Sequence, residues 1–162
     1  MIKRTFLNNN SKGDLADIGL AALESVQEDL QFWAEYGTDL ETYEGQSRDP
    51  DPEIITRFED LGDFFNYGLS FEFVPASTES DGYFCYLISW GGPSTEIRFH
   101  QHYTEFVYMD WFCAVGFNVT SESGFDWVRD WFDGCDSLRF KDKDAEDLYS
   151  LYHSPDTSED DE

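Results

Sequence analysis

Two histidines two residues apart come closer to a metal-binding or catalytic pattern than any other residues of this chain. His100 and His102 follow a run of alternating apolar residues, and alternate positions of a β-strand lie on one face of the sheet. With Cys113 or Glu105 brought close by the fold, the pair could supply ligands for a transition metal. The simpler interpretation, which we favour, is two exposed histidines on a strand.

The cysteines and glycines form no recognisable catalytic pattern. Cys85, Cys113 and Cys135 lack the spacing of metal-binding or redox motifs, and an odd number without a signal peptide indicates reduced thiols in a cytoplasm. A cysteine nucleophile would need a histidine neighbour that only the fold could supply. The sequence contains neither a phosphate-binding loop nor a dinucleotide fingerprint. We therefore expect a protein that is not an enzyme and that binds no metal or cofactor.

Charge is the property in which this chain differs most from an ordinary domain. It has 35 acidic and 10 basic residues and a formal net charge of −25. Self-repulsion at this level destabilises a compact state, so we expect the charge to serve binding. Nucleic acids and anionic membranes repel such a surface, whereas a basic protein surface attracts it. No apolar run approaches the roughly 18 residues of a membrane span.

A folded core is nevertheless expected, because 40% of the residues are hydrophobic and 18% are aromatic. The length of 162 residues fits one domain, which we assign to residues 1–153. Residues 154–162 (SPDTSEDDE) are predicted to be a disordered acidic tail. The opening MIKRTFLNNN has no apolar segment of signal-peptide length, so we expect a cytoplasmic location in a host bacterium.

Apolar residues at three- and four-residue steps predict two helices in the N-terminal half. The first spans Asp14–Tyr36 and the second about 53–66. Their predicted buried residues are Leu15, Ile18, Ala22, Val26, Leu30 and Trp33 in the first helix and Ile54, Phe58, Leu61 and Phe65 in the second. The segment 37–52 is rich in breakers and is predicted to be a loop. Residues 2–7 are predicted to form a short edge strand.

Four strands are predicted to follow as an antiparallel meander. They span 69–74, 83–90, 95–100 and 105–112, and the short loops between them favour pairing of neighbours. The second strand carries apolar side chains in both directions, which predicts a strand covered on both faces. Gly91, Gly92 and Pro93 are predicted to form the tight turn after it.

A third, aromatic helix is predicted at 121–134, with a serine at 121 or 123 as its N-cap. Phe125, Val128 and Phe132 form its apolar line. Nearby tryptophans either form an exposed patch for a partner or a homodimer, or pack in the core, which we favour. These tryptophans are Trp111, Trp127 and Trp131. A further short helix is expected at about 144–152.

Acidic side chains recur along the predicted helices opposite the apolar stripes. Residues 13–97 contain nineteen acids against Arg48 and Arg57. On a helix that rises about 1.5 Å per residue, steps of four and seven residues separate carboxylates by about 6 and 10 Å. Phosphates along one DNA strand are about 3.4 Å apart, so several segments together are needed to approach that density. The candidate partner-binding carboxylates are Asp14, Asp17, Glu24, Glu28, Glu35, Asp39, Glu41, Glu44, Glu53, Asp60, Asp63, Glu122, Asp126, Asp130 and Asp133.

The acidic faces are also compatible with two simpler origins. Each face can be the solvated side of an amphipathic helix, although such sides ordinarily mix lysine with glutamate. Adaptation to high salt also favours many acids and few lysines, although the aromatic content of 18% argues against it. We favour a surface that imitates the phosphates of nucleic acid.

The segment Tyr67–Phe112 carries three short motifs in order. They are Ser-Trp-Gly-Gly-Pro-Ser at 89–94, Glu-x-Arg-Phe at 96–99 and Asp-Trp-Phe at 110–112. In these motifs the segment resembles an uncharacterised family of small acidic proteins carried by plasmids, integrating conjugative elements and phages. The resemblance implies a mobile-element setting and no catalytic residue. The chain departs from the family after residue 112, where Cys-Ala-Val stands in place of Asp-Gly.

Together these features predict an α+β fold, in which a four-stranded antiparallel meander is flanked by two acidic helices and a C-terminal aromatic helix. We expect a non-enzymatic inhibitor that binds the basic nucleic-acid-binding surface of a host defence protein, such as a restriction enzyme or a CRISPR effector. One alternative is an immunity protein or antitoxin that neutralises a basic toxin. The other is a small metal-dependent hydrolase that uses His100 and His102.

Overall fold

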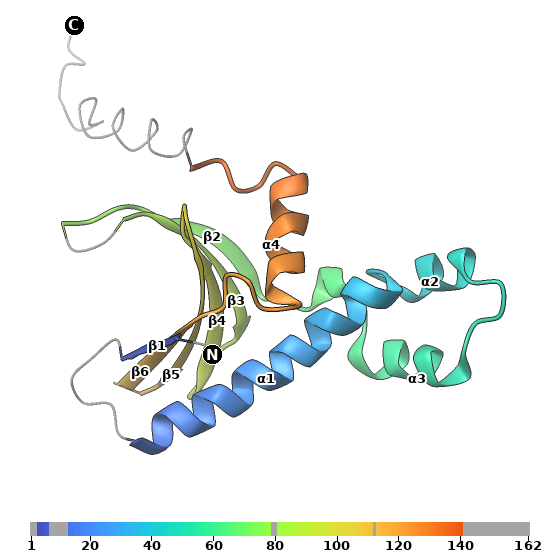
Figure 1. Ribbon diagram of the computed structural model, residues 1–162, viewed down its shortest axis with the longest axis horizontal. Coiled ribbons are helices and arrows are strands. Elements are labelled where there is room, and N and C mark those ends of the chain that lie inside the picture. Colours follow the sequence, from blue (N-terminus) through green and yellow to red (C-terminus); the bar gives the residue numbers. More distant parts are fainter. Residues whose placement is uncertain (1–2, 7–12, 79–80, 112, 141–162) are drawn as a thin grey trace, which may run out of the picture.

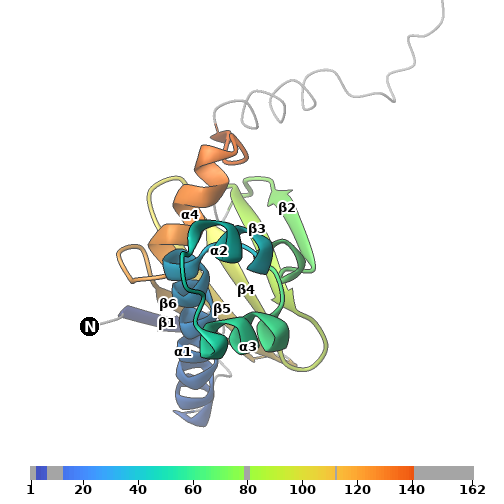
Figure 2. The ribbon, with the colours of Figure 1, turned by 90° about the vertical axis from the view of Figure 1, so that its right-hand side faces the viewer.

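An antiparallel β-sheet organises the chain, and helices pack against one of its faces (Figures 1 and 2). The structure is a computed structural model that describes residues 3–6, 13–78, 81–111 and 113–140. Its elements in chain order are β1 Lys3–Phe6, α1 Gly13–Tyr36, α2 Leu40–Gln46, α3 Pro52–Leu61, the 3₁₀ turn η1 Phe64–Asn66, β2 Ser70–Val74, β3 Tyr83–Ser89, β4 Ser94–Phe99, β5 Thr104–Asp110, β6 Cys113–Asn118 and α4 Phe125–Gly134.

Strands β2 to β6 form a five-stranded antiparallel meander, because each pairs with the next strand along the chain. This confirms the α+β class, with helices before and after the meander in the chain, but the predicted number of four strands is wrong. Strand β6 escapes prediction because its sequence, CAVGFN, has no clear apolar alternation. The predicted edge strand at 2–7 is confirmed, since β1 pairs with β6 at the far edge of the sheet.

Strand β3 is buried on one face and only partly covered on the other. Phe84 and Tyr86 point to the helices and are 3% and 6% exposed, whereas Cys85 and Leu87 on the opposite face are half-buried. No helix of the described residues lies on that opposite face, which we call the open face (Figure 1). The prediction that this strand is covered on both faces is therefore wrong. The turn predicted at 91–93 is confirmed, because it joins β3 to β4.

Helix α1 crosses the sheet through a line of buried residues that differs from the predicted stripe. Leu15, Val26, Leu30 and Trp33 are buried as predicted, but Ile18 is 51% exposed. The contact falls at the next residue, Gly19, where a Cβ would lie 2.9 Å from Val115 Cγ1 of β6. A glycine carries no hydrophobic signal, so the sequence pattern placed the contact one position too early.

The segment between α1 and β2 contains two helices where one was predicted. Helix α2 occupies part of the predicted loop 37–52. Helix α3 begins at Pro52 and ends at Leu61, earlier than predicted, because Gly62 adopts a φ of 87°. As a result Phe64 is buried at 2% exposure, and Phe65, predicted to be buried, is 61% exposed.

Helix α4 closes the aromatic core against α1 and the sheet. Phe125, Val128 and Phe132 are buried as predicted. The helix begins after Gly124 and no side chain caps it, so the predicted serine caps are wrong. Gly124 lies close to α1: a Cβ added at this position would be 3.1 Å from the Gln27 carbonyl oxygen. The helix predicted at 144–152 and the tail at 154–162 lie outside the described residues.

None of the helices in the described part of the chain is both long enough and apolar enough to cross a membrane. The longest is α1 with 24 residues, and its exposed side carries five of the candidate carboxylates. This agrees with the sequence, which contains no apolar run of the required length.

Candidate functional site

The acidic residues predicted to bind a partner lie at the surface. Of the fifteen candidates, all are exposed except Asp39, Asp63 and Glu122, which are half-buried. Their carboxylates are therefore accessible to a partner, as both a binding surface and an ordinary solvated face would require.

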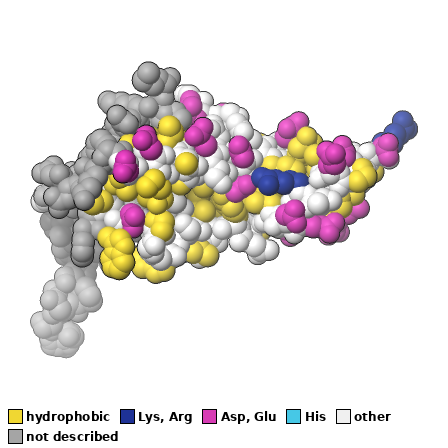
Figure 3. Space-filling view, turned by 90° about the horizontal axis from the view of Figure 1, so that it is seen from below, with side chains coloured by type: hydrophobic (Ala, Val, Ile, Leu, Met, Phe, Trp, Pro, Cys, Tyr) yellow, Lys and Arg dark blue, Asp and Glu magenta, His cyan; other side chains and the backbone are white. Residues whose placement is uncertain are grey.

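The most acidic part of the structure comprises α1, α2 and α3, which we call the helical arm (residues 13–66). It contains fifteen acids and, as bases, Arg48 and Arg57 alone. Helices α2 and α3 project beyond the sheet from the end of α1 (Figure 1). Figure 3, which shows the molecule from below, has acidic side chains spread over the part of this face that is not grey, with apolar, neutral and a few basic groups between them. The arm thus displays acids on an extended surface.

Arg57 is neutralised by a carboxylate within the arm. Its Nη2 atom lies 3.0 Å from Asp29 Oδ1, and the Tyr67 hydroxyl donates to the other oxygen of Asp29 at 2.9 Å. Burial raises the pKa of the Asp29 carboxyl, against the lowering effects of Tyr67 and Arg57. This ion pair ties α3 to α1, so Arg57 offsets little of the charge that a partner would meet.

Helix α4 adds its acids beside α1. The Gln27 side-chain amide donates to the Ser123 carbonyl at 2.9 Å, which places the start of α4 against the middle of α1. The structure therefore brings the acids of α1 and those around residues 122–133 onto neighbouring elements. The acids of α2 and α3 lie farther along the arm (Figure 1).

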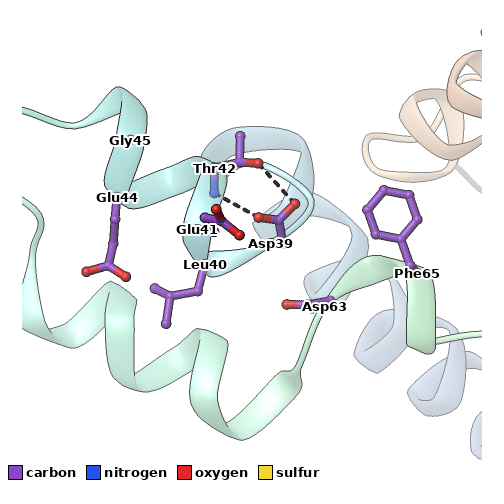
Figure 4. A pocket seen from close by; sticks show the side chains of 8 residues that line it. All are labelled: Asp39, Leu40, Glu41, Thr42, Glu44, Gly45, Asp63 and Phe65. Carbon is purple, nitrogen blue, oxygen red and sulfur yellow. Dashed lines mark hydrogen bonds between the residues drawn. The ribbon is translucent and has the colours of Figure 1, made fainter.

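A shallow acidic basin of about 1010 Å³ lies between α2 and η1 (Figure 4). It is lined by Asp39, Leu40, Glu41, Thr42, Glu44, Gly45, Asp63 and Phe65. Asp39 serves as the N-cap of α2, because it accepts hydrogen bonds from the Thr42 amide at 2.7 Å and the Thr42 hydroxyl at 3.0 Å. The Thr42 amide lowers the pKa of the Asp39 carboxyl. Asp39 therefore has a structural role as well as lining the basin, and Glu41, Glu44 and Asp63 are the other carboxylates of the lining.

The two histidines do not form the predicted pair on one strand face. Strand β4 ends at Phe99, so His100 and His102 both lie in the turn before β5. His100 is buried, stacks on Tyr103 at 4.1 Å between ring centroids, and lies 3.2 Å from Glu105 Oε1. His102 is exposed.

Metal-ligating side chains do not converge around these histidines. Cys113 and Glu105 lie at different ends of the β5–β6 pair, because Cys113 pairs with Asp110 whereas Glu105 pairs with Asn118. Within residues 3–6, 13–78, 81–111 and 113–140 no group of three histidine, cysteine or acidic side chains could hold a metal ion. The fold thus places Glu105 beside His100 but assembles no set of three ligands among the described residues.

A polar network around Glu96 and Arg98, the two charged residues of the Glu-x-Arg-Phe motif, covers part of the open face. Arg98 Nε lies 2.7 Å from Glu96 Oε2, and the Cys85 thiol donates to the same oxygen at 3.1 Å. Burial, aided by Glu96, raises the pKa of the Cys85 thiol to about 12. A thiol with such a high pKa is a poor nucleophile at neutral pH. Its burial beside Glu96, and the raised pKa that results, argue against a catalytic role for Cys85.

The three tryptophans considered for an aromatic patch occupy different environments. Trp127 and Trp131 are half-buried and pack on Phe64, with ring centroids 5.0 and 4.9 Å apart. Trp111 lies in the turn between β5 and β6 and is 83% exposed. Core packing is therefore confirmed for the two tryptophans of α4, and Trp111 is not part of their cluster.

No protein-family model matches this chain, and comparison with curated proteins and with solved structures gives no significant match.

Proposed function

We propose that this protein is a nucleic-acid-mimicking inhibitor that binds the basic DNA- or RNA-binding surface of a host defence protein. The observation that carries the proposal is the charge of the helical arm. Fifteen acids stand against two arginines there, and one of those arginines is paired with Asp29. Solvated helix faces ordinarily mix lysine with glutamate, and the arm has no lysine.

The dimensions of α1 suit this function. A helix of 24 residues is about 36 Å long, close to one turn of B-DNA at about 34 Å. Its exposed acids are nevertheless sparser than phosphates, which follow one another at about 3.4 Å on each strand. The acids of α2, α3 and α4 would therefore supply part of the contact. Electrostatic attraction would speed encounter with a basic groove and would weaken with salt.

Competition with DNA for its enzyme tests the proposal. A fluorescent duplex bound to purified restriction endonucleases and CRISPR effector complexes would be titrated with the protein, and release would be followed by anisotropy. We expect release from at least one of these enzymes, and a triple variant (Glu24→Gln, Glu28→Gln and Asp60→Asn) should compete about tenfold or more less well. All three side chains are exposed and none takes part in an ion pair within the described part of the chain, so the fold should be retained.

A matched control removes the same charge elsewhere. The variant Glu72→Gln, Asp81→Asn and Asp136→Asn also loses three exposed carboxylates but leaves the helical arm and α4 unchanged. Asp136 forms an ion pair with Arg139 at 3.8 Å, but both side chains are largely exposed, and such surface pairs contribute little to stability. It should compete nearly as well as the wild type. Equal competition by both triple variants would show that total charge matters and the arm does not, and DNA that stays bound to every enzyme would refute the proposal. Tight binding to a basic toxin without displacement of DNA would instead identify an immunity protein.

A further inference from the structure

An apolar pocket of about 230 Å³ opens between η1, the start of β2 and α4. Phe65, Leu69, Phe71, Trp131 and Phe132 contribute to its lining. The side chains of Phe65 and Leu69 are 61% and 60% exposed, although both are large and apolar. Pockets for drug-sized ligands span about 300–1,000 Å³, so this smaller pocket fits a single large apolar side chain.

The apolar pocket adjoins the acidic basin through one shared residue. Phe65 lines both, and its ring packs against Trp131 at 5.7 Å between centroids. On the basin side, Asp63 precedes η1 without capping it through its side chain. Figure 4 shows the Asp63 and Phe65 side chains pointing in different directions from this turn. The apolar pocket therefore adjoins a basin lined by four carboxylates, Asp39, Glu41, Glu44 and Asp63, with no basic residue in either lining.

The pocket also borders an edge strand. Strand β2 pairs with β3 on one side and is the last strand in the sheet order. Leu69, Ser70 and Phe71, where this edge begins, line the pocket. An edge strand offers main-chain hydrogen-bonding groups to an extended peptide, and alternate side chains of that peptide point to the same face. This favours a peptide over a compact small molecule as the occupant.

We propose that this pocket and basin form a binding site for an extended peptide of a partner protein, in which an arginine or lysine stands two residues from a large apolar side chain. The apolar side chain fills the pocket beside Phe65, and the basic side chain lies over the acidic basin. The charge of the basin is what selects a basic neighbour. This site does not rest on the proposed nucleic-acid mimicry, because the peptide is recognised by an apolar pocket that a phosphate mimic would not need.

Three synthetic peptides test the site on the full-length protein. The probe is Ac-Ser-Arg-Thr-Phe-Thr-NH₂, and the two controls replace its arginine with glutamate or its phenylalanine with alanine. Binding is followed by two-dimensional ¹H–¹⁵N NMR, with the indole N–H of Trp131 as the reporter and that of Trp111, in the β5–β6 turn, as the internal control. We expect saturable shifts at Trp131 with a dissociation constant on the order of 1 mM. Each control peptide should bind about fivefold or more less tightly.

Two protein variants locate the contact. Phe65→Ala should abolish the shifts at Trp131, and because Phe65 is largely exposed the fold should be kept, which a thermal melt would verify. Ile18→Ala removes another exposed apolar side chain on α1, outside both linings, and should bind as the wild type does. The proposal is overturned by any of three results: no saturable binding of the arginine peptide, equal binding of either control peptide, or unchanged binding to the Phe65→Ala variant. None of these results bears on competition with DNA.

Discussion

At the scale of single residues, Arg98 is the group on which the open face of the sheet depends. Its Nε lies 2.7 Å from Glu96, and its guanidinium carbon lies 4.9 Å from the centroid of the Tyr83 ring. Glu96, two residues earlier on β4, and Glu105, the partner of Arg98 on β5, are only 7% and 9% exposed. Burial lowers the pKa of Arg98, and the neighbouring acids, Glu96 above all, raise it by more. Acids in such an environment need a compensating cation.

Replacing Arg98 should therefore destabilise the protein strongly. Arg98→Ala leaves Glu96 without its ion-pair partner, and removing one member of a buried pair costs about 3–5 kcal/mol. The free energy of unfolding would be measured by urea titration. The double variant Glu96→Gln and Arg98→Met removes both charges and should recover most of the loss. A cost below about 1 kcal/mol for Arg98→Ala would mean that water, and not Arg98, compensates these acids.

At the scale of elements, the start of the short helix α2 depends on one side chain. None of its seven side chains is fully buried, although Leu40 and Tyr43 pack against the edge of the core. Asp39 caps it through Thr42, and the first backbone hydrogen bond runs from the Tyr43 amide to the Asp39 carbonyl at 3.1 Å. Composition alone made this segment look like a loop. A cap and a helix of seven residues, about two turns, are too short to produce an apolar period.

The cap makes the stability of α2 dependent on pH. Because hydrogen bonds from Thr42 lower the pKa of Asp39, its ionised form stabilises the helix. This contribution is fully present above the unfolded pKa of 3.8 and is lost as the pH falls through the lower folded value. We therefore expect hydrogen-exchange protection of the Thr42 and Tyr43 amides to fall at low pH.

Two variants of Asp39 separate capping from charge. Asp39→Asn keeps an oxygen acceptor at the N-cap and should retain most of the protection, without the loss at low pH. Asp39→Ala has no acceptor and should lose the protection at every pH. Similar protection in the alanine variant and the wild type would show that α3 holds α2 in place and that the cap is dispensable.

At the scale of the whole molecule, charge and core oppose one another. The net charge of −25 repels itself across a domain whose core is built from buried aromatic rings. Phe64 illustrates that core, because its ring contacts Trp33 of α1 and both Trp127 and Trp131 of α4. Such packing stabilises the fold without relying on salt. The charge therefore destabilises the folded state. That the protein carries it nevertheless is what we would expect if the acids form a binding surface.

Salt should raise the stability of the protein and weaken its binding to a basic partner. The Debye length falls from about 10 Å at 0.1 M to about 3 Å at 1 M, so added salt screens self-repulsion. We expect cooperative urea unfolding at about 0.05 M NaCl and a higher midpoint at about 0.5 M. The Glu24→Gln, Glu28→Gln and Asp60→Asn variant should show a smaller increase. A chain that is already unfolded at low salt would instead indicate adaptation to a saline environment.

Features that depend on local sequence were predictable. The apolar period identified α1 and α4 and their buried residues Leu30, Trp33 and Phe132, because a helix face is set by residues three and four apart. The turn at 91–93 followed from its glycines and proline. The exposure of most candidate acids also followed, since charged side chains are rarely buried without a partner. Composition alone determined that this is a strongly acidic protein with an aromatic core.

Features that depend on distant contacts required the tertiary structure. Strand β6 forms because β5 and β1 pair with it, and Gly116 leaves room for Glu105, whose Oε2 lies 2.5 Å from the position of a Cβ there. Gly19 rather than Ile18 meets the sheet, and the turn at Gly62 buries Phe64 and exposes Phe65. That last choice creates the apolar pocket beside the acidic basin. The backbone conformation at Gly62 determines which of the two adjacent phenylalanines is exposed. The spacing of the apolar residues does not predict that conformation.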